Sequence, residues 1–197
     1  MTEENNEMIG DYKGMVKNKV ITALLQAYMD TLDYDGMKSI LKEAEMLELK
    51  DIREVDPEET LDFFSFKKII TAQNCLLYGC YALLFEIGKK FSFYLFPFGK
   101  SFTEIVQDIN AYIRTKDFKV EILKETENTI KVKVQSCVFC SEIGVPCNLF
   151  VGFLVHSLEK SLPSNEKVRY MYEEEENVND PRHNTYVLTL EHYNEKI

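Results

Sequence analysis

The first half of the chain follows a helical pattern of apolar residues. Between Gly14 and Leu32, apolar side chains recur at intervals of three and four residues, which places them on one face of a helix. The polar stretch from Asp33 to Gly36 interrupts this pattern, and residues 37–49 offer a second, shorter helix. We therefore expect the N-terminal half to be helical.

The most apolar segment runs from Phe66 to about Ile87 and is expected to be one buried helix. Its central run from Cys75 to Phe85 has eleven residues and no charge, whereas a helix that spans a bilayer needs about 20 residues. The segment is therefore interpreted as a core helix and not as a membrane span. Cys75 and Cys80 would point in different directions on this helix and are expected to be buried, reduced thiols.

The pattern changes from helical to strand-like after residue 114. Ser101 and Glu104 have the spacing of a capping box, which predicts a helix over residues 102–114. Helical spacing returns in residues 146–162. Four segments alternate apolar and polar residues and predict two hairpins: residues 118–126, 129–136, 166–174 and 185–193.

This order of elements predicts an α+β fold. N-terminal helices would pack on a four-stranded antiparallel sheet, with one late helix between the two hairpins. The sequence has no internal repeat and no long linker, so we expect a single ligand-binding domain over residues 13–195. Residues 1–12 are acidic and polar and are expected to be a disordered N-terminus.

Charge and composition restrict the classes of partner. The 197 residues include 33 acidic and 23 basic side chains, for a net charge of −10, which would repel nucleic acid and anionic lipid. The N-terminus lacks the basic and apolar pattern of a secretory signal, so we expect a cytoplasmic protein without a membrane span. Five cysteines in a reducing compartment indicate metal binding, catalysis or burial and not a set of disulfides.

Common catalytic motifs are missing from the sequence. The chain has three histidines and no G-x-G-x-x-G, H-E-x-x-H or G-x-S-x-G motif. The segment from Gly99 to Ser101 resembles the end of a phosphate-binding loop, but Tyr94 stands where that loop requires its first glycine. We therefore expect a binding protein and not an enzyme.

An aromatic stretch, "FSFYLFPF" at residues 91–98, follows the apolar segment. Such a stretch either fills a core or lines an apolar cavity, because small-molecule pockets are walled mostly by hydrophobic and aromatic side chains. We take the second interpretation as the hypothesis. The residues expected to line this pocket are Cys75, Leu76, Tyr78, Cys80, Leu83, Phe91 and Phe96.

Three of the five cysteines fall in "CVFCSEIGVPC", residues 137–147. Cys137 and Cys140 are separated by two residues, so both sulfurs can face one ion, and Cys147 stands at the head of the next predicted helix. We expect a structural zinc site here; inert packing and redox chemistry are the alternatives. The fourth zinc ligand would be His183, a glutamate of the last hairpin or water, whereas His156 would lie on the opposite face of its helix.

The sequence resembles the 4-vinyl reductase domain over about residues 10–195. The segments that carry the resemblance are "YGCYALLFEIGKKFSF" from residue 78, "FTEIV" from residue 102 and "SCVFCSEIGVPCNLFVGFLVHSLE" from residue 136. This superfamily contains aromatic-sensing activator domains and is related in fold to the vesicle-tethering TRAPP subunits.

The resemblance implies a compact α+β domain whose cavity holds a hydrophobic small molecule or an acyl chain, often beside zinc. Cys147 matches one zinc ligand of that family. The other ligands would be a glutamate and cysteines of the final hairpin, where this chain has Glu173, Glu176 and His183 and no cysteine. Cys137 and Cys140 would then replace the missing thiols.

The function expected from the sequence is therefore the binding or sensing of a hydrophobic small molecule, with zinc at the cysteine cluster. One alternative is an accessory protein that handles or reduces a tetrapyrrole or another cofactor. A second is a dimeric scaffold subunit like the vesicle-tethering proteins. A homodimer is a further expectation, and any output partner is not identifiable from the sequence.

Overall fold

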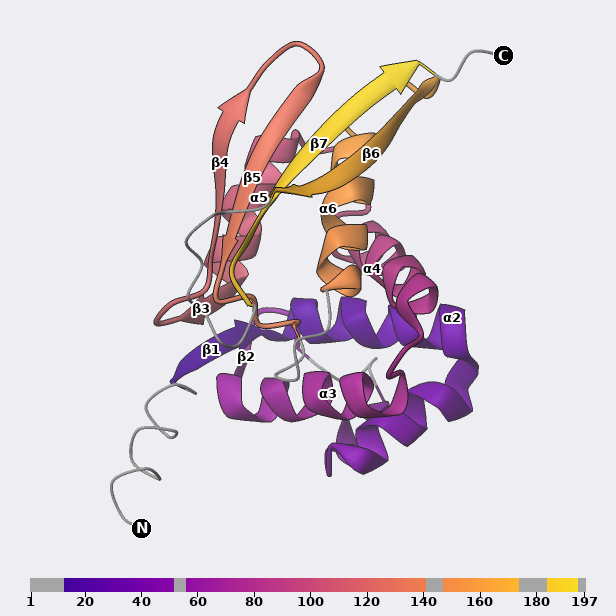
Figure 1. Ribbon diagram of the computed structural model, residues 1–197. Helices are drawn as coiled ribbons and strands as arrows, with labels where there is room; N and C mark the ends of the chain where they lie inside the picture. The colour runs from indigo at the N-terminus through magenta and orange to yellow at the C-terminus, as the bar shows by residue number, and fades with distance from the viewer. Residues whose placement is uncertain (1–12, 52–55, 141–146, 174–183, 195–197) are drawn as a thin grey trace.

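The computed structural model describes residues 13–51, 56–140, 147–173 and 184–194. Helices form one part of the molecule, and a four-stranded sheet with α5 (Phe102–Tyr112) and α6 (Asn148–Glu159) behind it forms the other (Figure 1). The predicted α+β class is confirmed. The predicted disordered segment, residues 1–12, lies outside the described residues.

The helices of the described residues agree in their main features with the periodicity. They are α2 (Asn18–Glu43), the 3-10 helix η1 (Leu47–Lys50), α3 (Phe63–Leu76), α4 (Tyr81–Leu95), α5 (Phe102–Tyr112) and α6 (Asn148–Glu159). α2 continues past the predicted break but is kinked at Asp33, where φ is 65° and ψ is −176°. α5 begins with the predicted capping box, in which Ser101 and Glu104 each bond the backbone N–H of the other.

Two helix boundaries differ from the prediction. Gly14 to Lys17 form strand β1 and not the first turn of a helix, because this segment pairs with two short strands. The single helix expected over residues 66–87 is interrupted between α3 and α4, where Gly79 adopts φ of 78°. That left-handed conformation costs little for glycine and ends the helical hydrogen-bond pattern.

The strands form two antiparallel sheets. The larger one has the order β4-β5-β7-β6 and confirms the predicted four-stranded antiparallel sheet. A small sheet of order β2-β1-β3 was not predicted, because strands of three or four residues are too short to show alternation. The bounds are β1 (Gly14–Lys17), β2 (Thr60–Asp62), β3 (Ile113–Thr115), β4 (Lys119–Glu125), β5 (Thr129–Gln135), β6 (Glu166–Glu173) and β7 (Tyr186–Asn194).

α6 is the most buried helix segment of the core and packs against both α4 and β6. Gly88 on α4 and Gly152 on α6 allow the two helices to approach closely, since a Cβ at either position would meet backbone of the other helix. Ser92 and Ser157 form a buried hydrogen bond of 2.8 Å across the same contact. The close contact fixes the head of α6 relative to α4.

Among the residues that the structure describes, no helix is both long enough and apolar enough to cross a membrane.

Candidate functional site

Three cysteines from two parts of the chain converge beside the end of β5. Cys137 follows β5 after Ser136, whose φ of 46° turns the backbone. The N–H of Cys137 donates to the carbonyl of Asn184 at 2.7 Å, and the N–H of Cys140 donates to the carbonyl of Cys137 at 3.4 Å. Cys147 is the N-cap residue of α6. The site therefore joins the end of a sheet strand to the head of the buried helix.

The sulfur atoms of Cys137, Cys140 and Cys147 all lie within 4.8 Å of one another. The sulfur atoms of Cys137 and Cys147 lie 3.4 Å apart. None of the three residues is more than 5% exposed. The hydroxyl of Tyr186 on β7 donates to the sulfur of Cys137 at 3.6 Å. The structure thus brings together the three predicted cysteines and adds a tyrosine to them.

The environment of the three thiols shifts their pKa values in different directions. Burial opposes ionisation of Cys137, but hydrogen bonds from Cys140, Cys147 and Tyr186 outweigh it and hold its pKa well below the usual value. Burial raises the pKa of Cys140 and Cys147 well above the usual value. Cys137 is therefore the one of the three thiols whose ionisation this environment favours, and the thiolate is the form of cysteine that binds metals.

A continuous row of aromatic rings leads from α4 to the cysteines. Phe85 on α4 stacks on Tyr170 with centroids 5.7 Å apart. Tyr170 meets Tyr172 at 6.1 Å, and Tyr172 meets Tyr186 at 5.7 Å, both with one ring edge directed at the other ring. These distances are those of direct aromatic contact. We call Phe85, Tyr170, Tyr172 and Tyr186 the aromatic row.

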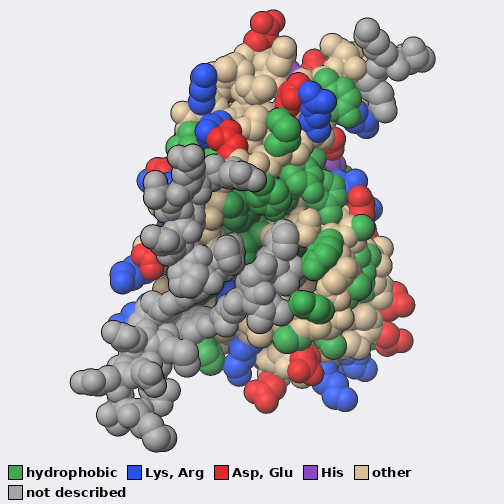
Figure 2. All heavy atoms as spheres, in the orientation of Figure 1, with side chains coloured by type: hydrophobic (Ala, Val, Ile, Leu, Met, Phe, Trp, Pro, Cys, Tyr) green, Lys and Arg blue, Asp and Glu red, His purple; other side chains and the backbone are tan. Residues whose placement is uncertain are grey.

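The aromatic row is exposed at one of its four rings. Tyr172 is 42% exposed, while the other three rings are partly buried. Figure 2 shows hydrophobic side chains gathered in the middle of one face, where the sheet meets the helices in Figure 1. The opposite face of β6 and β7 carries ion pairs, among them Arg169 with Glu191 at 2.8 Å. The two faces of the same strands therefore differ in the ligands they could accept.

The structure separates the residues expected to line one pocket. Phe91 and Phe96 are buried among other core rings, and Leu83 is partly buried. Cys75, Leu76, Tyr78 and Cys80 are exposed around the turn between α3 and α4. The expectation that Cys75 and Cys80 are buried thiols is wrong, because Gly79 divides the apolar run and turns its middle to the surface.

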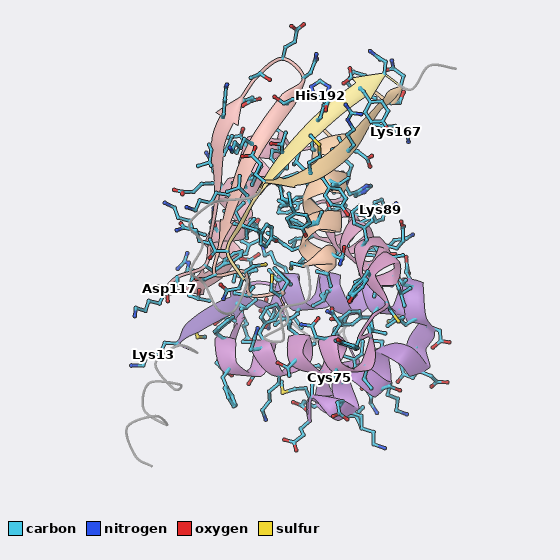
Figure 3. All side chains as sticks on the ribbon, viewed as in Figure 1. Lys13, Cys75, Lys89, Asp117, Lys167 and His192 are labelled. Atoms are coloured by element: carbon cyan, nitrogen blue, oxygen red, sulfur yellow. The ribbon has the colours of Figure 1, made fainter. Side chains whose placement is uncertain are left out.

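Cys75 borders a shallow surface pocket of about 230 Å³ between α2 and α3. Its other lining residues are Glu43, Ala44, Glu45, Phe64, Lys68, Thr71 and Ala72. This volume is below the roughly 300–1,000 Å³ that is typical of small-molecule pockets. Figure 3 shows Cys75 at the helical end of the molecule and His192 in the sheet at the other. The pocket is therefore remote from the four-stranded sheet.

The predicted fourth ligand lies outside the described residues. His183 and Glu176 both belong to the residues that are not described. Glu173 on β6 is described, and its carboxylate accepts a hydrogen bond from Thr189 and forms an ion pair with Lys131. His156, which was excluded from the cysteine site, is on α6 and forms no part of the cluster in the described residues. No histidine or carboxylate of the described residues joins the three sulfurs.

The tyrosines of the site were not predicted from the sequence. Tyr170 and Tyr172 are two residues apart on a strand, and this spacing alone places them on one face. Tyr186 reaches Cys137 because it pairs with Val134 in the register of β5 and β7. The alternation of residues in β6 could have indicated that Tyr170 and Tyr172 share a face. The register between β5 and β7, which places Tyr186, cannot be derived from the sequence alone.

The fold matches that of solved H-NOX domains. A single-residue variant of Tt H-NOX aligns with a TM-score of 0.60 and 13% identity over 92% of this chain and 97% of that one. An oxygen-binding H-NOX domain related to soluble guanylate cyclases, in its oxygen complex, gives 0.58 and 14% identity over 92% and 96%. A mutant of the K. algicida H-NOX protein, Fe(II) unliganded, gives 0.57 and 13% identity over 92% and 98%.

Two more of the similar structures, with TM-scores of 0.55 and 0.57, are described as structures that address distortion of the haem. No protein-family model and no curated protein matches the chain significantly. At such low identity, these similarities establish the H-NOX-like fold of the chain and nothing further about its chemistry.

The resemblance to the 4-vinyl reductase domain is corrected by these comparisons. No family model supports it, and the similar structures are H-NOX domains. The resemblance depended mainly on the order of helices and strands together with a cysteine-containing segment. An order of elements is compatible with more than one family, because fold does not determine function.

The prediction of zinc as the cofactor is also wrong. Two of the structures that share the fold are described by their haem, and none of the reported structures is described by zinc. In addition, the described residues supply three sulfurs and no fourth side-chain ligand from histidine or carboxylate, whereas structural zinc sites are almost always four-coordinate.

The described residues do not fit a haem either. Haem requires a flat apolar slot and an axial ligand, commonly histidine or a thiolate. The central rings Phe91, Phe139, Phe150 and Phe153 contact one another with centroids 4.9 to 5.7 Å apart and fill the interior.

The two described histidines also fail as interior haem ligands. His192 on β7 contacts Glu166 and the carbonyl of Glu127 through its two ring nitrogens. His156 has a buried Nε2 without a hydrogen-bond partner, but its side chain is a quarter exposed and its Nδ1 lies 3.9 Å from a carboxylate oxygen of Glu159. We therefore derive no haem chemistry for this chain.

Proposed function

We propose that the chain is a sensory domain with an H-NOX-like fold that binds a flat, apolar small molecule at the aromatic row. The observation that carries this proposal is the row itself, in which four aromatic side chains from α4, β6 and β7 touch in sequence while Tyr172 stays 42% exposed. The proposal keeps the small-molecule binding expected from the sequence and moves the site away from residues 75–80.

Stacking is the interaction that such a row offers to a ligand. Aromatic contacts contribute about 0.5–1.5 kcal/mol beyond the burial of area. Burial and the nearby thiols raise the pKa of Tyr172, so its hydroxyl stays protonated at neutral pH and can donate a hydrogen bond to a ligand. A planar molecule with one acceptor group is the class that these features favour.

The fold supports a sensory role by analogy. The similar structures include an oxygen-binding domain related to soluble guanylate cyclases. This chain would then respond to its ligand without catalysing a reaction, and a homodimer and a cytoplasmic location remain predictions. In our proposal the ligand is not haem, because aromatic side chains fill the described interior.

Binding of the neutral dye N-phenyl-1-naphthylamine to paired variants tests the proposal. Tyr172→Ala removes the most exposed ring of the row and is expected to weaken dye binding about tenfold, which corresponds to about 1.4 kcal/mol. Tyr193→Ala is the matched control, because Tyr193 is 44% exposed and its ring lies near Arg169 on the opposite face. Equal dye affinities for the two variants would overturn the proposal.

A further inference from the structure

The three-cysteine cluster lies beyond the end of the aromatic row, and stacking of a ligand does not require it. Cys137 and Cys140 belong to one turn, whereas Cys147 comes from the head of α6. Isolated buried cysteines are common as small apolar side chains. Three cysteine sulfurs within 4.8 Å of one another are a different case, because their arrangement could hold one metal ion.

The backbone near the cluster is held in an uncommon conformation. Ser136 has φ of 46°, which is a strained region for a residue other than glycine. The N–H of Ser136 donates to the hydroxyl of Thr185 at 3.1 Å, and Asn184 accepts from Cys137 on the same side. These bonds from the two residues before β7 keep Cys137 turned toward Cys140 and Cys147.

A positive charge stands beside the cluster. The ammonium of Lys67 on α3 donates to the carbonyls of Val138 and Cys140 at 3.5 and 3.3 Å. These carbonyls belong to the turn that carries two of the thiols. An ammonium so placed lowers the electrostatic cost of a buried anionic sulfur group. Tyr186 adds a hydroxyl donor to Cys137 from the opposite strand.

We propose that Cys137, Cys140 and Cys147 bind one thiophilic monovalent metal ion of the copper(I) kind. Soft thiolate ligands select soft ions, and an all-sulfur set of three suits an ion that accepts low coordination numbers. The ion keeps its oxidation state, so the step needs no oxidant. Each metal–sulfur bond to a thiol releases its proton to solvent.

Anaerobic titration of the reduced full-length chain with copper(I), against a chromophoric copper(I) chelator, measures the binding. The expected result is uptake of about one ion per chain and a rise in melting temperature that grows with copper(I) concentration, because the ion binds the folded state. Cys147→Ser should abolish this uptake. Cys75→Ser is the control and should retain it, since Cys75 is exposed and is not one of the three clustered cysteines.

The neighbouring lysine gives a finer test. Lys67→Gln keeps all three sulfurs and should weaken copper(I) binding by about tenfold, the lower end of the loss typical for groups that support metal ligands. A folded Lys67→Gln protein with unchanged affinity would remove the lysine from the proposal. Full uptake by a folded Cys147→Ser variant would overturn the cysteine site itself.

Cysteine labelling of the unmodified protein keeps the proposal testable if a variant fails to fold. Mass spectrometry should find that an alkylating reagent modifies Cys137, Cys140 and Cys147 more slowly with copper(I) bound than without it, while Cys75 and Cys80 react in full in both states. Protection of the exposed pair in place of the cluster would contradict the assignment. Absence of copper(I) uptake by the fully reduced protein would do the same, and both results would leave the dye-binding proposal standing.

Discussion

Gly88 on α4 and Gly152 on α6 bring two helix backbones into direct contact. A Cβ added at Gly88 would lie 2.8 Å from the carbonyl carbon of Leu149, and one at Gly152 would lie 2.9 Å from that of Phe85. Real Cβ atoms do not approach backbone this closely. The contact therefore fixes Phe85, the first ring of the aromatic row, relative to α6, whose head carries Cys147.

Gly152→Ala should destabilise the protein, because the new methyl group has to push α4 and α6 apart. We expect a loss of at least about 1–3 kcal/mol in the free energy of unfolding, the usual cost of overpacking a core. Urea denaturation measures it. Gly99→Ala is the control, since a Cβ there meets nothing within 4 Å. A Gly152→Ala protein as stable as Gly99→Ala would refute the close helix contact.

Substitutions of the buried, hydrogen-bonded residues Ser92 and Ser157 should have non-additive effects on the free energy of unfolding. Ser157→Ala leaves the Ser92 hydroxyl buried without its 2.8 Å partner, which typically costs about 1–3 kcal/mol. Replacing both serines by alanine removes both polar groups and should cost less than the sum of the single changes. Urea unfolding of the two single variants and the double variant measures the coupling; strict additivity would contradict the bond.

Glu58 should contribute to the stability of the fold in a pH-dependent way. Hydrogen bonds from Lys19 and Lys17 lower the pKa of Glu58 from 4.5 to about 2. Because the folded-state pKa is depressed, the contribution is fully present above pH 4.5 and is lost as the pH falls toward about 2. The melting-temperature difference between wild type and Glu58→Gln should therefore shrink over this window. In a protein that also carries Lys17→Gln and Lys19→Gln, the same comparison should show no such narrowing, because both donors to Glu58 are gone.

Added haemin should not form a defined complex. The described interior is filled by Phe91, Phe139, Phe150 and Phe153 and offers no slot for a macrocycle. We expect titration to give no saturable, sharpened Soret band. A band that saturates at one haemin per chain and disappears in His156→Ala would show that the buried Nε2 of His156 is an axial ligand. That result would contradict the conclusion that the described residues do not fit a haem.

The long periodic elements were predictable, and the short ones were not. The hairpin of β4 and β5 and the capping box of α5 follow directly from alternation and from the spacing of Ser101 and Glu104. β1 and β2 exist only because each pairs with a distant segment. The turn at Gly79 lies in a uniformly apolar run, where one glycine is too weak a signal to divide a predicted helix.

The candidate site was predictable in its cysteines and not in its tyrosines. The spacing of Cys137 and Cys140, with Cys147 at the head of a helix, is a local pattern that the sequence displays. Tyr186 contacts Cys137 through the pairing of β7 with β5, and Phe85 contacts Tyr170 through the packing of α4. Such contacts depend on strand register and helix packing, which the periodicity of one sequence does not specify.

The central claim is that an apolar molecule binds along the aromatic row. Nuclear Overhauser effects between N-phenyl-1-naphthylamine and the ring protons of tyrosines, assigned by single Tyr→Phe substitutions, test this most directly. We predict contacts from the bound dye to Tyr170 and Tyr172, and none to Tyr193, which lies near Arg169 on the other face. Contacts to the rings around residues 75–80 or to Tyr193, with none to Tyr172, would contradict the account.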